Sequence, residues 1–317
     1  MVISMKNNSI PTIRTPEDVV DVIPCLLGFH PTDSIVAIQI RGGEVALTAR
    51  WDLACAQGES GVDRVCDELA GIADIHPAEQ TSFIVVVYAE HDLGREIASG
   101  VWDGLGCAHV LDALVVDRDR WWFADQPSDS PGHRIAGPGR LSRALGGSVA
   151  ASRADLAASI AAPKGSDEDE MTQTLVDAIE SSWDEDPFTV GRQVVSLMDG
   201  WCTGESLTDQ DFLAAGAAMS VGTARDQLWK VLTTSKAVAC LPFWKEVLIR
   251  TPYPMRSAVL GVTAMVAWVA GEGALMNICI EEAEKTDPDY PLVSLVKQIS
   301  MACLTPASWE EIRAEVV

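Results

Sequence analysis

The chain has 317 residues, which is enough for two modest domains that each bury a hydrophobic core. A hydrophobic content of 48% excludes wholesale disorder, and a formal net charge of −23 argues against partners such as nucleic acid or an anionic membrane. The acidic residues are spread over both halves of the chain, which is typical of a solubility feature.

Cysteine usage and the apolar segments predict the compartment. Eight cysteines are scattered singly, with no C-x-x-C pair, as is typical of a reducing environment. The N-terminus lacks the apolar core of a signal peptide. The longest apolar run, residues 258–271, is too short to span a bilayer. We therefore expect a cytoplasmic protein.

The first expected element is a short helix that turns through a tight corner into a buried strand. Thr15 can cap this helix, Pro16 suits its first position, and Gly28 supplies the left-handed residue that ends it. Pro24 lies within the apolar run and predicts a kink or break in the last turn. Residues 35–40 are apolar at nearly every position, which indicates a central strand.

The rest of the first half alternates strands and helices. In chain order we expect a hairpin turn at residues 41–44, a strand at 45–51, a helix at 60–75, a strand at 82–88, a helix at 91–105 and strands at 113–116 and 120–123. The two hairpins require antiparallel neighbours, whereas the helical crossovers permit parallel ones. This half is therefore predicted to be an α/β domain, a mixed sheet with flanking helices. Of Trp121 and Trp122, alternation predicts that one faces outward, although packing is favoured over a nucleic-acid surface.

A change of composition marks the expected domain boundary. Residues 127–162 are punctuated by glycine and contain one expected helix, at 152–161. Residues 163–186 open with a polar, acidic run that reads as an exposed linker or a helix start. The predicted domains are therefore 1–162 and 187–317.

The second domain is expected to be all-α. Its helices are predicted after Asp186–Pro187, at 211–219, 222–232, 237–249, 255–270, 274–285 and 291–302, and after Thr305–Pro306. Ala264, Gly271, Ala283 and Pro288 fall where a tetratricopeptide repeat places its small residues, its turn glycine and its terminal proline. This single match predicts a tetratricopeptide-like helical bundle, not a long solenoid.

The sequence contains no strong catalytic motif. Phosphate-binding loops, dinucleotide fingerprints, zinc-protease helices and hydrolase elbows are all missing, so no cofactor and no metal is expected. The four acids at 167–170 lack the ligand spacing of a calcium loop and read as a solvated linker.

The best catalytic candidates are His30, Asp33 and Ser34, on the loop that leads into the first strand. A histidine held by a carboxylate beside a hydroxyl can act as base and nucleophile. The same residues are also explained as the turn of a tight corner, and we favour that structural interpretation.

Three stretches carry a resemblance to a known family. They are LLGFHPTDSIV at residues 26–36, RWW at 120–122 and GEGALMNICIEEAEKTDPDYPL at 271–292. The three stretches occur in the same order in the family of domain of unknown function 4192, from actinobacteria and their phages, and the chain resembles that family. No activity is established for that family, so the resemblance implies none. Relatives often carry a cysteine-rich turn after the RWW strand, whereas residues 124–131 contain no cysteine, so a metal or redox role finds no support here.

Three functions follow as hypotheses. Helical-repeat surfaces generally bind peptides or proteins, and large aromatic side chains can anchor a partner, although most are expected in the core. The tryptophans of the second half are Trp183, Trp201, Trp229, Trp244, Trp268 and Trp309. We therefore expect a non-enzymatic protein-interaction or adaptor protein that binds another protein or a peptide, with self-association possible.

The alternatives are an enzyme with a pocket near His30 and Asp33, or an acidic mimic that blocks a basic surface. A deep pocket converging on His30 and Asp33 favours the enzyme, and a shallow, packed corner favours the adaptor.

Overall fold

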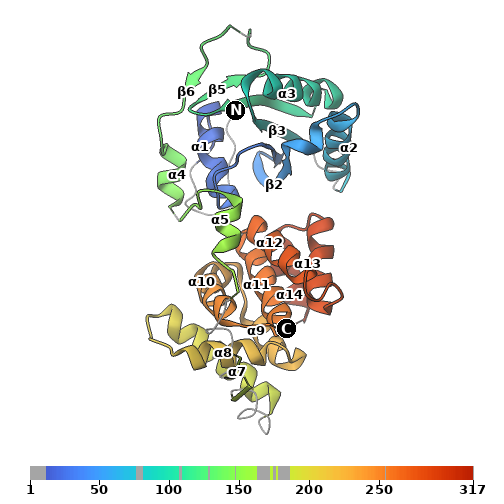
Figure 1. Ribbon diagram of the computed structural model, residues 1–317. Helices are drawn as coiled ribbons and strands as arrows, with labels where there is room; N and C mark the ends of the chain where they lie inside the picture. The colour runs from blue at the N-terminus through green and yellow to red at the C-terminus, as the bar shows by residue number, and fades with distance from the viewer. Residues whose placement is uncertain are drawn as a thin grey trace. The chain divides into compact units, whose positions relative to one another are not determined.

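The computed structural model describes residues 12–75, 81–106, 109–127, 129–146, 148–162, 172–173, 176–177, 186–253 and 255–316 (Figure 1). The chain divides into two compact units, Met1–Arg153 and Ala154–Val317. Most of the expected acidic linker at 163–186, with its four adjacent acids, lies outside the described residues.

The N-terminal unit is built on a mixed, six-stranded sheet with helices. Its elements are α1 (Pro16–Leu27), β1 (Ser34–Arg41), β2 (Glu44–Asp52), the 3-10 helix η1 (Leu53–Ala56), α2 (Gly61–Asp74), β3 (Thr81–Tyr88), α3 (His91–Leu105), β4 (Val110–Asp117), β5 (Arg120–Phe123), β6 (His133–Arg134) and α4 (Arg140–Leu145). The strand order is β2-β1-β3-β4-β5-β6. β3 and β4 are parallel, and every other neighbouring pair is antiparallel. The expected α/β architecture is confirmed, whereas β6 and α4 were not predicted.

The helix-to-strand corner forms as its residues dictate. The Asp18 backbone N–H donates to Thr15 Oγ1 at 3.2 Å, and Gly28 ends α1 in the left-handed region with φ of 76°. α1 continues past Pro24 to Leu27, so the predicted break does not occur. At the next turn, Gly42 and Gly43 both have positive φ, as the hairpin between β1 and β2 requires.

Helices cover both faces of the sheet. α2 and α3 pack on one face, and α1 and α4 lie on the other side (Figure 1). The first layer includes Ile35, Val85, Val115, Leu69, Ile97 and Val101. The alternate strand residues, among them Val36, Ile84, Val86 and Leu114, are also buried. Burial on both faces explains why β1 and β3 read as continuous apolar runs.

The prediction that one tryptophan of β5 faces outward is wrong. Trp121 and Trp122 are both buried, at 2% and 7% exposure. The His133 ring stacks on Trp121 at 4.2 Å between ring centroids. On the other face, Trp122 lies 4.5 Å from the His91 ring, and its indole N–H donates to the Ser130 carbonyl at 3.0 Å. The chain after β5 folds back over the strand, so the pair packs the sheet, as the favoured interpretation held.

The C-terminal unit is all-helical. After α5 (Arg153–Ala158), which crosses the division, it contains α7 (Pro187–Cys202), α8 (Asp209–Ala218), α9 (Gly222–Val231), α10 (Thr234–Arg250), α11 (Arg256–Ala270), α12 (Gly273–Glu284), α13 (Pro291–Met301) and α14 (Pro306–Val316). Asp186 caps α7, and Thr208 forms a reciprocal capping box with Asp211 on α8. These helices confirm the expected all-α region.

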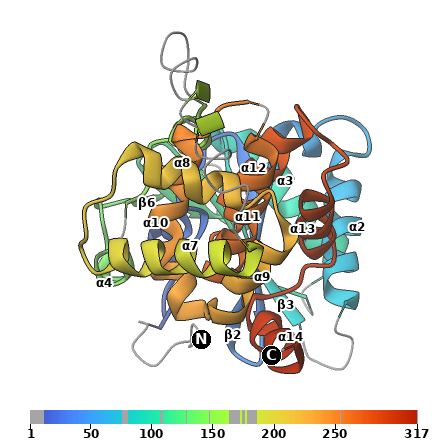
Figure 2. The ribbon, with the colours of Figure 1, turned by 90° about the horizontal axis from the view of Figure 1, so that it is seen from below.

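α11 is the central helix of this unit. Nearly all of its residues are buried, and it contacts α8, α10, α12, α13 and α14 (Figure 2). The Arg256 guanidinium, 2% exposed, donates to the carbonyls of Leu248, Thr251 and Ile160 and so closes the end of α10. In the described part of the chain, no helix is both long and apolar enough to cross a membrane.

Candidate ligand-binding pocket

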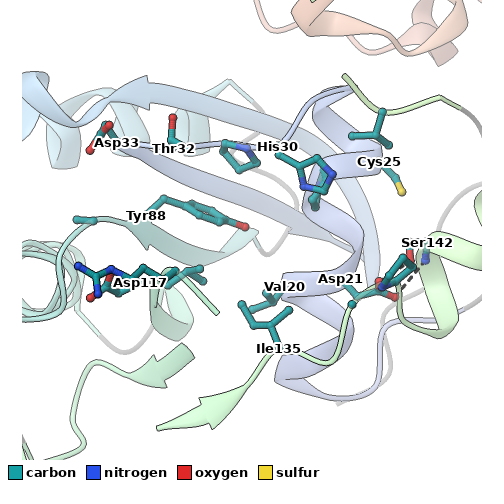
Figure 3. Close-up of a pocket in the computed structure, with 18 of the residues that line it drawn as sticks. Val20, Asp21, Cys25, His30, Thr32, Asp33, Tyr88, Asp117, Ile135 and Ser142 are labelled. Atoms are coloured by element: carbon teal, nitrogen blue, oxygen red, sulfur yellow. Dashed lines mark hydrogen bonds and ion pairs between the residues drawn. The ribbon is translucent and has the colours of Figure 1, made fainter. Parts of the chain in front are cut away.

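A pocket of about 760 Å³ opens at one edge of the N-terminal sheet (Figure 3). Tyr88 and Asp117, at the carboxyl ends of the parallel strands β3 and β4, line it. β1 runs antiparallel to β3, so its start lies at the same edge, with Ser34 paired to Tyr88. Ligands of open α/β sheets bind outside the carboxyl ends of such strands. The position of this pocket is therefore typical of a binding site.

Four parts of the chain form the walls. α1 contributes Val20, Pro24 and Cys25, and the corner before β1 contributes residues 30–33. The ends of β3 and β4 also line the pocket, and the last wall includes Ile135, Ser142 and Val149. The lining is mostly apolar, with a few charged and hydroxyl groups. Ligand pockets commonly combine an apolar body with a small number of placed polar groups.

Tyr88 places a buried hydroxyl at the pocket. The residue is 8% exposed, and within the described residues its hydroxyl has no hydrogen-bond partner. Figure 3 shows the hydroxyl oxygen directed into the space between Val20 and His30. Burial raises the pKa of this phenol, so it remains a neutral hydroxyl. A buried hydroxyl without a partner carries an energetic cost that a ligand can remove.

Asp33 and Asp117 flank Tyr88 at neighbouring strand ends. Asp33 precedes β1 and adopts a left-handed backbone with φ of 43°, and its carbonyl accepts the Leu53 N–H at 2.8 Å. Its side chain is exposed, and no donor to its carboxylate is found in the part of the chain that the structure describes. The Asp117 carboxylate is 26% exposed and lies 3.9 Å from the Arg118 guanidinium. Both carboxylates therefore retain acceptor capacity toward the pocket.

The predicted candidates His30, Asp33 and Ser34 are not assembled as a triad. Ser34 is fully buried, and its hydroxyl donates to the Thr32 carbonyl and accepts from Arg50 Nε at 3.1 Å. His30 is anchored through its backbone, whose N–H donates to the Ala150 carbonyl at 3.0 Å. Its exposed side chain lines the pocket, but among described residues no hydrogen bond joins it to Asp33 or Ser34. His30 and Asp33 thus belong to the pocket, whereas Ser34 belongs to the corner.

Asp21 holds the wall formed by α4. Its carboxylate accepts hydrogen bonds of 2.5 to 3.1 Å from the backbone N–H groups of Gly139, Leu141 and Ser142 and from the Ser142 hydroxyl (Figure 3). Burial by itself raises the pKa of Asp21, but the hydrogen bonds from Ser142, Gly139 and Leu141 outweigh burial and lower it. Gly139 makes this approach feasible, because a Cβ there would lie 2.5 Å from the Asp21 carboxyl carbon.

Sequence reasoning missed Tyr88, Asp117 and Asp21 as pocket residues. Tyr88 ends an apolar run that reads as core, and its hydroxyl at the end of a strand was the available signal. Asp21 looks like an ordinary polar position on α1. Its partners lie about 120 residues further along the chain, so no local pattern marks it.

The described residues contain no group of three or more histidine, cysteine, aspartate or glutamate side chains arranged to hold a metal ion. The chemistry on offer is hydrogen bonding and charge, from the Tyr88 hydroxyl, the carboxylates of Asp33 and Asp117, and the His30 imidazole, within apolar walls.

Of three comparisons with known proteins, only the one with protein families gives a match. No match was found among curated proteins or among solved structures. The three stretches quoted from the sequence, by contrast, lie within a family match that spans residues 16–307. That family is described as Domain of unknown function (DUF4192), and because its model covers most of the chain, the protein belongs to it.

Proposed function

We propose that the N-terminal unit binds a small organic molecule in the pocket at the ends of β1, β3 and β4. The observation that carries this proposal is the Tyr88 hydroxyl, which is buried at the pocket without a partner within the described residues. The volume of about 760 Å³ falls in the range of small-molecule sites. A ligand that forms a hydrogen bond with this hydroxyl would remove the cost of burying it without a partner.

Binding is favoured over acid–base catalysis. A catalytic pair needs its two side chains within hydrogen-bond reach, directly or through one water. Figure 3 places Asp33 on the far side of Tyr88 from Asp21 and Cys25, and no hydrogen bond between His30 and Asp33 occurs among the described residues. The enzyme alternative therefore has a pocket in its favour but no assembled catalytic pair.

Tyr88→Phe tests the proposal. Removing the hydroxyl should leave the melting temperature unchanged or slightly higher, because the lost group has no partner to lose. It should weaken a compound that uses this hydroxyl about tenfold, the value of one hydrogen bond. The measurement is a ligand-observed NMR screen of a metabolite and fragment library against the full chain, followed by titration of each hit.

Two further variants sharpen the test. Tyr253→Phe, at a half-exposed tyrosine of the C-terminal unit, is the matched control and should leave every hit unchanged. Tyr88→Trp replaces the hydroxyl by a larger indole and should weaken every compound that contacts this position. A screen in which no hit responds to either Tyr88 variant would overturn the proposal.

The protein-interaction role expected for the helical region has less support. Of the tryptophans proposed as anchors, Trp244, Trp268 and Trp309 are buried, and Trp201 and Trp229 are partly buried. Trp183 lies outside the described residues. The tetratricopeptide-like character stays a proposal supported by the α11–α12 pair, which turns at Gly271. The acidic-mimic role likewise rests on composition alone.

A further inference from the structure

We propose that the molecule bound in this pocket is a small organic cation, such as an amine or amidine with an apolar body. This inference rests on the proposed binding function and specifies its ligand class. It follows from which charged side chains of the lining are already occupied by the protein and which are free.

Neither of the two arginines of the lining is positioned to bind an anion in the pocket. The side chain of Arg118 is 91% exposed, on the turn between β4 and β5. Arg143 is also exposed, and its Nε donates to the Gly139 carbonyl at 2.8 Å. An anionic ligand would need a guanidinium held toward the pocket for a bidentate contact. Neither arginine is held in this way.

Two of the four carboxylates of the lining are also occupied. Asp21 is saturated by the N–H groups and the hydroxyl of the α4 wall. Glu90 caps α3, where its side chain accepts the Leu93 N–H. The remaining two, Asp33 and Asp117, accept no hydrogen bond from a donor in the described part of the chain. The Arg118 guanidinium lies 3.9 Å from the Asp117 carboxylate, which is too far for a hydrogen bond.

The two remaining carboxylates belong to the strand ends on either side of Tyr88. Tyr88 is in register with Ser34 on one neighbouring strand and with Val116 on the other. Asp33 and Asp117 are the next residues at the same edge, and adjacent strands are about 4.8 Å apart. Figure 3 shows Asp33 and Asp117 on one side of the pocket, whereas the Tyr88 hydroxyl points away from both, into the space between Val20 and His30. Two carboxylates at one end of the pocket suit a positively charged group with several N–H donors, and the Tyr88 hydroxyl lies further along the same cavity.

The field of the whole chain acts in the same direction. A formal net charge of −23 raises the local concentration of cations and repels anions. The apolar walls formed by Val20, Pro24 and Ile135 line the same pocket and suit a hydrocarbon or aromatic body.

The test compares matched probes that share an aromatic body and a two-carbon chain and differ in the head group, which is cationic, neutral or anionic. 2-Phenylethylamine, 2-phenylethanol and 3-phenylpropionate, together with the corresponding trios on other aromatic scaffolds, are titrated against the full chain by ligand-observed NMR at pH 8. We expect the amines to bind at least tenfold more tightly than their alcohols and acids, with a preference that declines as sodium chloride is added.

Asparagine variants test which carboxylates cause the preference for amines. Asp33→Asn and Asp117→Asn should each reduce it several-fold, and asparagine tolerates the left-handed backbone at residue 33. Asp119→Asn is the matched control, because Asp119 is two residues from Asp117 but is not part of the lining. Tyr88→Trp identifies which probes occupy the pocket.

The possible outcomes separate the two proposals. Pocket binders that show no amine preference, or that favour the acids, overturn the cation inference and leave the binding function standing. If neither these probes nor the wider library yields a compound sensitive to Tyr88→Trp, both proposals fail. An amine preference that survives both asparagine variants also contradicts the inference.

Discussion

Asp21 of α1 caps the distant helix α4, which has no capping side chain at its own N-terminus. α4 has six residues and no cap of its own, since its N-cap position is Gly139. The carboxylate that satisfies its first N–H groups comes from α1. An acidic group at a helix N-terminus also interacts favourably with the helix dipole. Asp21 therefore fixes both the start of α4 and one wall of the pocket.

Asp21→Asn should weaken the protein in a pH-dependent way. The folded pKa of Asp21 is lowered, so its charge stabilises the protein above its unfolded pKa of about 3.9, and this contribution is lost as pH falls through the folded value. We expect a loss of about 1–2 kcal/mol at pH 7, because the charge-assisted hydrogen bonds become neutral. Urea unfolding of both proteins from pH 7 to pH 3 measures it.

The difference between wild type and Asp21→Asn should shrink as the pH falls below the unfolded pKa of about 3.9, because the unfolded wild-type carboxyl then takes up a proton that the folded one, with its lowered pKa, does not. Asp129→Asn serves as a control at a surface acid for which no hydrogen bond is described and should give no difference at any pH. A gap that stays constant over the whole range would mean that charge is not what Asp21 contributes.

Two pocket residues break local rules in ways that fit a binding site. Asp33 is one of three non-glycine residues with positive φ in the described chain, and Tyr88 buries a hydroxyl without a partner there. Each feature has a cost, and such costs concentrate at functional sites. Their position at adjacent strand ends supports one site that uses both.

At the scale of elements, Gly271 ends α11 in the left-handed region with φ of 85°. Gly271→Ala should destabilise the protein by about 1–2 kcal/mol, because an L-residue is disfavoured there. No heavy atom lies within 4 Å of a Cβ built at this position, so the loss would come from backbone strain and not from a clash. Chemical denaturation measures the effect.

Gly273→Ala is the matched control for Gly271→Ala. Gly273 begins α12, has equally open surroundings and does not have a positive φ. Alanine there should cause no loss, since alanine favours helix formation relative to glycine. Equal losses at both positions would refute strain at Gly271 as the cause.

Elements with local signals were predicted from the sequence, and elements held by distant residues were not. The cap at Thr15, the helix start at Asp186–Pro187 and the hairpin turn at 41–44 were all predicted, and the structure confirms them. α4 was missed because its cap lies on α1. That Trp121 and Trp122 are both buried was missed, because the residues that cover them, His133 on one face and His91 on the other, lie elsewhere in the sequence.

The candidate site was predicted only in part for the same reason. The sequence placed His30 and Asp33 on one corner, and both line the pocket. Tyr88 and Asp117 become their neighbours only through the register of β1, β3 and β4. The order of strands in the sheet is a tertiary property, and no spacing along the chain reveals it.

At the scale of the whole molecule, acidic residues outnumber basic ones by 46 to 23, and the sequence pI is about 4.4. Ion pairs such as Lys236–Asp199 at 2.8 Å and Arg250–Asp209 at 2.6 Å offset part of this excess. Exposed pairs each contribute little, about 0–1 kcal/mol. The dominant electrostatic effect near neutral pH is therefore repulsion among carboxylates.

Salt should consequently stabilise this protein. Raising sodium chloride from 0.01 M to 0.15 M shortens the screening length from about 30 Å to about 8 Å, which weakens both the repulsion and the ion pairs. Because acids are in twofold excess, the lost repulsion should exceed the lost attraction, and the melting temperature should rise by about 2–5 °C. Calorimetry at pH 7.5 in sodium chloride, with potassium chloride as the control for a specific cation effect, measures the shift. A melting temperature that falls with added salt would show that the ion pairs, not the surplus carboxylates, govern the electrostatics of the fold.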